Sequence, residues 1–317
     1  MIGTLSRANP SAESGASALA PAHPCLGEGG NRGNGGPSVL ASRSPTLEPV
    51  TTSARVSPPT THNPRFLAAD CAAVIPCFNE AKTIADVVRS LRRKVSAIFV
   101  IDDGSTDDTA IEASREGAVV LRHASNRGKG AALRTGWGCA RQDGFHWALT
   151  IDGDAQHSVR DLPRFFDAAI ATGAALVVGN RMHAAAAMPP LRRAVNRIMS
   201  WKLSKAAGKH LPDSQCGFRL LNLHHWAALD LHTEHFEIES ELLLRLVRAG
   251  LRVEFVPIQV IYKGEQSKIH PFRDTVRWLR WWMRATKRKN ESCEPVSPDP
   301  ERGLKQTSCL RIPASGL

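Results

Sequence analysis

Four carboxylates in two short loops are the residues of this chain whose types and spacing point most directly to chemistry. Asp102 and Asp103 follow one apolar run, and Asp152 and Asp154 follow another. In an open α/β sheet, ligands bind outside the carboxyl ends of the strands. Neighbouring carboxylates there would repel each other unless a cation or a donor-rich ligand joined them. The pattern therefore predicts a site for a divalent metal that carries a nucleotide diphosphate.

The two loops are suited to different parts of such a ligand. Asp102 and Asp103 stand directly at a strand end before Gly104, so they can accept hydrogen bonds from a base edge and from ribose hydroxyls. Asp152 and Asp154 are two positions apart in an extended segment, so both can address one ion, or one can bind metal while the other orders the ribose. We expect Mg²⁺ or Mn²⁺ at this second loop, because both ions prefer oxygen ligands.

Two further segments could contact the same ligand. The run 75–80, Ile-Pro-Cys-Phe-Asn-Glu, follows the first predicted strand and could hold one face of a nucleoside. In the run 126–130, Asn-Arg-Gly-Lys-Gly, Lys129 stands at a predicted helix start. Free amides, the helix dipole and an ammonium would bind an anion there. The spacing of a phosphate-binding P-loop is absent, so the segment predicts only a general anion site.

Strands and helices alternate from residue 72 onward, as the spacing of apolar residues indicates. Expected strands are 72–75, 97–101, 118–121, 147–151 and 174–178, and expected helices are 81–93, 129–142, 161–171 and one that ends at 116. A helix over 191–207, a strand over 218–221, a helix over 239–249 and an extended run over 252–262 follow. This repeat predicts an α/β fold with right-handed crossovers and a mainly parallel central sheet flanked by helices.

Composition separates this core from its flanks. Residues 1–67 are rich in Gly, Ser, Pro, Ala and Thr without periodicity, so they are predicted to be disordered. We expect a nucleotide-binding domain over 68–268, a separate helix over 269–290 and a disordered tail over 291–317. The seven cysteines form no CxxC pair, which argues against zinc and against a disulfide framework. No run reaches the roughly 18 apolar residues of a membrane span.

In order and spacing these segments resemble the family 2 glycosyltransferases, most closely the dolichyl-phosphate mannosyltransferase-like branch. The resemblance runs from residue 72 to about 268 and rests on IPCFNE, DDGSTDDT, NRGKG, DGDAQH and DSQCGFR at 75–80, 102–109, 126–130, 152–157 and 213–219. Shorter matches lie at 179–181, 236–239, 262 and 267–268. The combination is specific for the superfamily and much less specific for the sugar.

The resemblance implies a GT-A type fold that moves a sugar from a UDP- or GDP-sugar to a polyprenyl phosphate with Mg²⁺ or Mn²⁺. By match, the residues that contact the nucleoside are Pro76, Asn79, Glu80, Asp102 and Asp103. The metal and the diphosphate would meet Asp152, Asp154 and Gln156. The donor or lipid phosphate would meet Arg181, Arg193, Arg219 and Lys268, with Lys129 as a further anion contact. The expected catalytic residues are Asp154, Arg181, Arg219 and Lys268.

The acceptor decides whether such a site needs a base. A phosphate monoester has a second pKa near ~6, so at neutral pH it can attack the anomeric carbon directly. Cations must then hold two anionic reactants together. A hydroxyl acceptor would instead need a base, and Glu237 or Glu239 could serve. A polysaccharide or other hydroxyl acceptor therefore stays open as an alternative.

Segment 272–288 is amphipathic in a way that suits a membrane surface. At 100° per residue its arginines and lysine fall within about 100° of one another, and tryptophans and other apolar residues cover the remainder. Such a helix can lie on anionic lipid. The alternative is a helix that packs on the domain with a solvated basic edge.

We expect a peripheral protein at the cytoplasmic face of a membrane, held there by this helix or by a membrane-protein partner. The net charge of +11 favours polyanionic partners without choosing among them. No nucleic-acid-binding motif is present, so nucleic acid is not an expected partner. A catalytically inactive basic binding protein is the less favoured reading.

Overall fold

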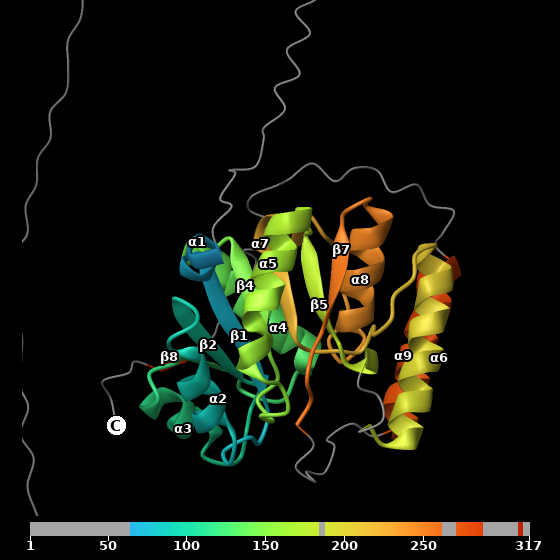
Figure 1. The fold of residues 1–317 in the computed structure, drawn as a ribbon. Coiled ribbons are helices and arrows are strands. Elements are labelled where there is room, and N and C mark those ends of the chain that lie inside the picture. The colour runs from blue at the N-terminus through green and yellow to red at the C-terminus, as the bar shows by residue number, and fades with distance from the viewer. Residues whose placement is uncertain (1–63, 184–187, 262–270, 288–309, 313–317) are drawn as a thin grey trace, which may run out of the picture. The chain divides into compact units, whose positions relative to one another are not determined.

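The computed structural model describes residues 64–183, 188–261, 271–287 and 310–312, and within them one eight-stranded sheet carries the fold (Figure 1). The strand order is β7-β5-β6-β4-β1-β2-β3-β8. The strands are β1 Cys71–Cys77, β2 Ala97–Asp102, β3 Val119–Arg122, β4 Trp147–Thr150, β5 Leu176–Asn180, β6 Arg219–Asn222, β7 Val253–Pro257 and β8 Leu310–Ile312. The expectation of an α/β fold is confirmed.

Parallel pairing dominates the sheet, as the run of buried strands predicts. β1 pairs in parallel with β2 and β4, β2 with β3, and β5 with β7. Nearly every residue of β1 and β2 is buried, which is typical of strands covered on both faces. β6 is the exception inside the sheet, because it runs antiparallel between β4 and β5.

The described α-helices lie between these strands along the chain, except α1, which precedes β1. They are α1 Pro64–Ala69, α2 Ile84–Leu91, α3 Thr109–Arg115, α4 Lys129–Gln142, α5 Leu162–Thr172, α6 Pro190–Ala207, α7 Leu223–Ala227, α8 Ile238–Arg248 and α9 Pro271–Lys287. α2 buries the apolar residues whose helical spacing predicted it. α4 approaches β1 and β2 so closely that a Cβ on Gly136 would lie 2.3 Å from Cγ1 of Val74. Glycine is therefore required at this crossing.

The flanks differ from the sequence expectation at two places. α1 begins at Pro64, inside the segment predicted to be disordered, and its Leu67 is buried in the core. Three residues of the predicted tail form β8, which pairs antiparallel with β3 at the sheet edge. Backbone hydrogen bonds make such an edge pairing, and they leave little trace in side-chain periodicity. Residues 1–63 lie outside the described ranges.

α9 packs on the domain through its aromatic side. Only 2% of Trp278 is exposed, and its indole Nε1 donates to Oγ of Ser240 in α8 at 2.9 Å. The ammonium of Lys202 in α6 lies 4.4 Å from the ring centroid of Trp282, and α6 and α9 lie side by side (Figure 1). The alternative, a helix that packs on the domain, therefore describes this segment, because Trp278 is buried and cannot contact lipid. The prediction of a membrane surface here rests on the basic edge and on Met283, which is 49% exposed.

No helix within the described ranges is long and apolar enough to cross a bilayer.

Candidate functional site

Sheet topology brings the predicted site segments together at the carboxyl ends of the parallel strands. β1, β2, β4 and β5 run in the same direction, so the loops that follow Cys77, Asp102, Thr150 and Asn180 leave the same side of the sheet. Antiparallel β6 begins at that side, where Arg219 pairs with Thr150. The segments found in the sequence are therefore neighbours in space.

Hydrogen bonds join the loop after β1 to the loop after β2. The backbone N–H of Asn79 donates to Oγ of Ser105 at 2.9 Å, and its side-chain oxygen accepts from the N–H of Thr106 at 2.8 Å. The N–H of Glu80 donates to Oγ1 of Thr109 at 2.8 Å. Asn79 has φ +54°, a left-handed conformation that asparagine tolerates better than most residues. Asn79 and Glu80, which are predicted to contact the nucleoside, therefore also fix the shape of these loops.

Asp102 ends β2 as a fully buried carboxylate. Its Oδ1 accepts from the N–H of Ser105 at 2.9 Å, and its Oδ2 lies 3.2 Å from Nε of Arg122. That Oδ2 accepts no hydrogen bond of good geometry from the described residues. A buried acceptor of this kind fits a donor group on a ligand. Pro76 stands one residue before the end of β1, opposite Ile101.

Asp103 shapes the loop that precedes α4. Its two carboxylate oxygens accept from the N–H groups of Arg127 and Gly128 at 2.9 and 2.7 Å. Oδ1 also lies 2.6 Å from Nδ1 of buried His123. Asp103 is thus heavily engaged within the chain, and its contact with a nucleoside stays a prediction.

Lys129 bridges two acidic segments at the centre of the site. Its ammonium lies 2.7 Å from Oδ1 of Asp152 and 2.7 Å from Oε1 of Glu239, at the start of α8. Burial alone would lower the pKa of Lys129, but the two carboxylates outweigh it and raise that pKa above its usual range. Burial would raise the pKa of Asp152, yet Lys129 and nearby His157 hold it well below its usual range. Both groups are therefore ionised at neutral pH.

Asp154 carries the less compensated charge of the DGD segment. Burial, and then the charge of Asp152, raise the pKa of Asp154. Its Oδ1 accepts from the backbone N–H of Gln156 at 3.0 Å, which fixes the carboxylate in the turn. A carboxylate beside a like charge with a raised pKa is one that a cation would stabilise.

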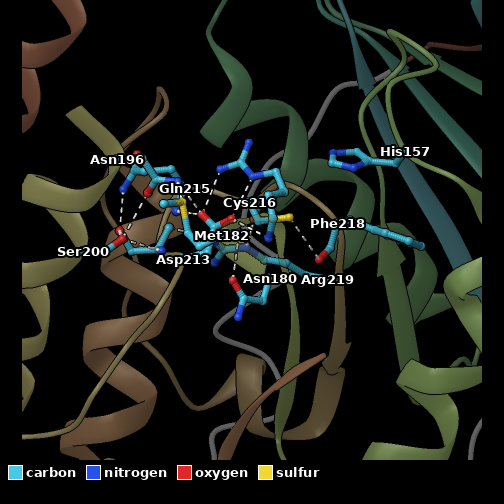
Figure 2. Close-up of polar contacts among 12 residues, drawn as sticks. His157, Asn180, Met182, Asn196, Ser200, Asp213, Gln215, Cys216, Phe218 and Arg219 are labelled. Carbon is cyan, nitrogen blue, oxygen red and sulfur yellow. Dashed lines mark hydrogen bonds and ion pairs between the residues drawn. The ribbon is translucent and has the colours of Figure 1, made fainter. Parts of the chain in front are cut away.

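Close packing fixes the carboxylate of Asp152. A Cβ on Gly217 would lie 2.4 Å from Oδ2 of Asp152, so the segment before β6 lies directly against it. His157 lies beside Phe218, with ring centroids 5.5 Å apart (Figure 2), and its Nε2 is 3.6 Å from the same Oδ2. The Nδ1 atom of His157 is buried without a hydrogen-bond partner among the described residues.

A second polar cluster lies between the end of β5 and α6. The guanidinium of Arg181 donates to both carboxylate oxygens of Asp213, from Nε at 2.8 Å and from Nη2 at 2.9 Å. Nδ2 of Asn196 donates to Oδ1 of Asp213 at 3.0 Å, and Ser200 lies beside Asn196 (Figure 2). Burial would raise the pKa of Asp213, but Arg181 outweighs it and lowers that pKa to about 2. Arg181 is thus positioned by a buried ion pair.

Arg219 is bonded to the backbone rather than to a carboxylate. Its guanidinium, 2% exposed, donates to the carbonyl oxygens of Cys216, Ser214 and Glu239 at 2.7, 2.9 and 2.7 Å. These bonds tie β6 to the start of α8, so the residue organises the site. Its predicted contact with phosphate stays a prediction.

The remaining predicted residues are spread more widely. Arg193 is half-buried in the first turns of α6, and Lys268 lies outside the described residues. Sequence reasoning missed the bridging role of Lys129 toward Glu239 and the pairing of Asp213 with Arg181. The DSQCGFR motif contained Asp213, but nothing in its spacing indicates which arginine it meets.

The donor set fits a magnesium or manganese ion that arrives with a ligand. Among the described residues, no group of three or more His, Cys, Asp or Glu is arranged to hold a metal by itself. Asp152 and Asp154 offer the oxygen atoms that these ions take, and the less compensated charge of Asp154 favours a cation. Such ions often use one or two carboxylates and complete their shell with substrate phosphates and water.

Comparison with known proteins identifies relatives of this chain. Residues 72–224 match the family described as Glycosyl transferase family 2. Uncharacterized glycosyltransferase Mb0553 of Mycobacterium bovis is 31% identical over 213 residues, which cover 64% of this chain and 91% of the relative. UDP-N-acetylglucosamine–dolichyl-phosphate N-acetylglucosaminyltransferase of Methanococcus voltae is 29% identical over 212 residues, which cover 60% of this chain and 84% of that protein.

Solved structures show the same fold. Mycobacterium tuberculosis glucosyl-3-phosphoglycerate synthase, in complex with Mn²⁺, UDP and glucosyl-3-phosphoglycerate, aligns with a TM-score of 0.55 at 20% identity. The alignment covers 70% of this chain and 81% of the other. The expected GT-A type fold is confirmed by this likeness.

Proposed function

Because this chain belongs to the family 2 glycosyltransferases, enzymes that transfer sugars, we propose that it moves a sugar from a UDP- or GDP-sugar to a polyprenyl phosphate. The relative from Methanococcus voltae, whose name specifies dolichyl phosphate as acceptor, supports the choice of acceptor. The acceptor's phosphate attacks the anomeric carbon, the bond from that carbon to the donor diphosphate breaks, and the nucleoside diphosphate leaves.

The charge balance of the site is the observation that carries this proposal. Three described cations of the site are already engaged: Lys129 pairs with two carboxylates, Arg181 pairs with Asp213, and Arg219 donates to three carbonyl groups, which hold it in place without neutralising it. Because carboxylates already neutralise much of the charge of Lys129 and Arg181, a divalent cation would supply charge that the donor diphosphate needs. A divalent ion at Asp154 and Asp152, with Gln156 nearby, would neutralise the departing diphosphate.

In this proposal the loops after β1 and β2 receive the nucleoside. Asp102 offers the buried acceptor, and Pro76, Asn79 and Glu80 border it. Arg181 and Arg219, with Arg193 and Lys268, remain the candidates for the donor or lipid phosphate. Catalysis then consists of holding two anionic reactants in position, because a phosphate dianion needs no base.

A radiochemical transfer assay tests the proposal. The full-length protein is incubated with polyprenyl phosphate, Mg²⁺ or Mn²⁺ and labelled UDP- and GDP-sugars in turn, and label is counted in the organic extract. We expect product with at least one donor, loss of product in EDTA, and loss in Asp154→Asn with its unfolding curve unchanged. Label that appears only in hydroxyl acceptors would replace the proposal with the alternative, in which Glu237 or Glu239 supplies the base.

The membrane location is part of the same proposal. A polyprenyl phosphate lies in a bilayer, so we propose a peripheral protein at the cytoplasmic face, and a membrane-protein partner is compatible with it. Edge residues Arg273, Arg280 and Arg284 of α9 are exposed and could meet anionic lipid.

A further inference from the structure

Helix α6 buries two polar residues and exposes three large apolar ones, which is unusual for a surface helix. Polar Asn196 and Ser200 face the protein and are buried. Apolar Leu191, Ile198 and Trp201 face outward with 68%, 54% and 56% of their surface exposed. A surface helix normally buries its apolar stripe and exposes its polar one. An external contact that covers these apolar side chains would account for the arrangement.

The exposed apolar residues form one stripe along the helix. At 100° per residue, Leu191, Ile198 and Trp201 fall within about 80° of one another. The centre of that stripe lies about 180° from the buried side formed by Asn196, Ser200 and Leu203. The outer stripe, defined here as Leu191, Ile198 and Trp201, therefore points directly away from the domain.

Every charged residue of α6 is basic. They are Arg192, Arg193, Arg197, Lys202 and Lys205, and the helix contains no Asp or Glu. Lys205 places its ammonium 4.4 Å from the ring centroid of Trp201, so the indole and a cation stand together at the stripe. Tryptophan rings beside lysine and arginine suit the headgroup level of a membrane that contains anionic lipid.

From these observations we propose that the outer stripe of α6 docks on an anionic lipid surface. The charge of the helix argues against a second copy of the chain, since two such stripes would bring basic residues face to face. α9, by contrast, buries Trp278 and exposes only part of its apolar side. The docking surface is thus α6 and not the tryptophan side of α9.

The same helix reaches the site from its inner side. Nδ2 of Asn196 donates to Asp213, the partner of Arg181, and Ser200 accepts from the N–H of Ser214 at 2.9 Å. A bilayer that held the outer stripe would therefore lie one helix away from the cluster that positions Arg181. The inference deepens the proposed function, because it says how the chain reaches an acceptor within a membrane.

Vesicle flotation with the full-length protein tests the proposal. The vesicles contain phosphatidylcholine alone or phosphatidylcholine with phosphatidylglycerol. We expect the wild type to float mainly with the phosphatidylglycerol vesicles and to be released by high salt. The variant Leu191→Gln/Ile198→Gln/Trp201→Gln should bind at least tenfold more weakly, because it removes three apolar side chains from the lipid contact.

A matched control separates α6 from α9. Met283 is a comparable exposed apolar residue on α9, 49% exposed, and Met283→Gln should bind vesicles as the wild type does. The melting temperatures of both variants should stay near that of the wild type, since the replaced side chains face solvent. Loss of binding in Met283→Gln but not in the α6 variant would overturn the proposal.

Other results also overturn it. These are a wild type that binds neither vesicle, an α6 variant that floats normally, and a wild-type dimer in solution that the α6 substitutions dissociate. Flotation requires no turnover, so it is independent of the transfer assay. A protein that floats through α6 but transfers no sugar to a short-chain polyprenyl phosphate would retain this inference and lose the proposed function.

Discussion

Replacing Asp213 with leucine removes the carboxylate that holds the buried guanidinium of Arg181. Two charge-assisted hydrogen bonds, at 2.8 and 2.9 Å, are lost, and a buried positive charge is left without its partner. Hydrogen bonds to charged groups contribute about 1.5–3 kcal/mol each. Breaking a buried ion pair by deleting one side costs about 3–5 kcal/mol. We therefore expect Asp213→Leu to lower the free energy of unfolding by about 4 kcal/mol.

The pKa of Asp213 gives a separate and smaller figure. Its fall from 3.8 to about 2 corresponds to roughly 2 kcal/mol between the ionised and protonated forms. This value is below the cost of deletion because a protonated carboxyl group can keep some of its hydrogen bonds. A carboxylate with a lowered folded-state pKa stabilises the fold above its unfolded-state pKa, and that stabilisation is lost as the pH falls toward 2.

Urea denaturation of a double-mutant cycle measures the pair. Asp213→Leu, Arg181→Met and the double variant are compared with the wild type at neutral pH. We expect the double variant to recover at least about 2 kcal/mol relative to the sum of the single effects. Additive losses, or a cost below about 1 kcal/mol for Asp213→Leu, would refute the reasoning. A folded double variant with wild-type transfer activity would remove Arg181 from the catalytic set.

Three further predictions concern acid stability, the DGD segment and Lys129. Between pH 5 and pH 2, urea denaturation should show the wild type losing roughly 2 kcal/mol more than Asp213→Asn, and equal losses would contradict the pKa argument. Gly217→Ala should displace the Asp152 carboxylate and lower the transfer rate by roughly 100-fold, since a misplacement near 1 Å costs about that much. Gly138→Ala in α4, where a Cβ meets nothing within 4 Å, is its control and should keep the rate while gaining about 0.5–1 kcal/mol of stability. In EDTA, Lys129→Met should lower the free energy of unfolding by about 1–3 kcal/mol. Mn²⁺ should raise the melting temperature of this variant more than that of the wild type, because the metal no longer competes with an ammonium. An equal response to Mn²⁺ in both proteins would show that Lys129 and the metal do not share a site.

Local patterns in the sequence determined the strands, the loops after them and the family. Each of these signals is local. An apolar run indicates a buried strand, and carboxylates that directly follow it lie at the carboxyl end of that strand, where ligands bind in such sheets. The motifs from 75–80 to 213–219 accordingly predicted the fold and the family, and the roles of the site residues within them stay predictions. The pairing of β8 with β3 was missed, because an edge strand of three residues has too little pattern to detect.

Contacts between distant segments were decided only in the tertiary structure. Lys129 reaches Glu239 across 110 positions, and Asp213 meets Arg181 because β6 is inserted antiparallel between β4 and β5. The helices show the same limit. Amphipathic spacing says that a helix has two sides, but the neighbours it packs against decide which side is covered. The sequence thus indicated a membrane-binding helix at 272–288, whereas packing buries Trp278 there and leaves Trp201 of α6 exposed, since burial depends on the whole fold.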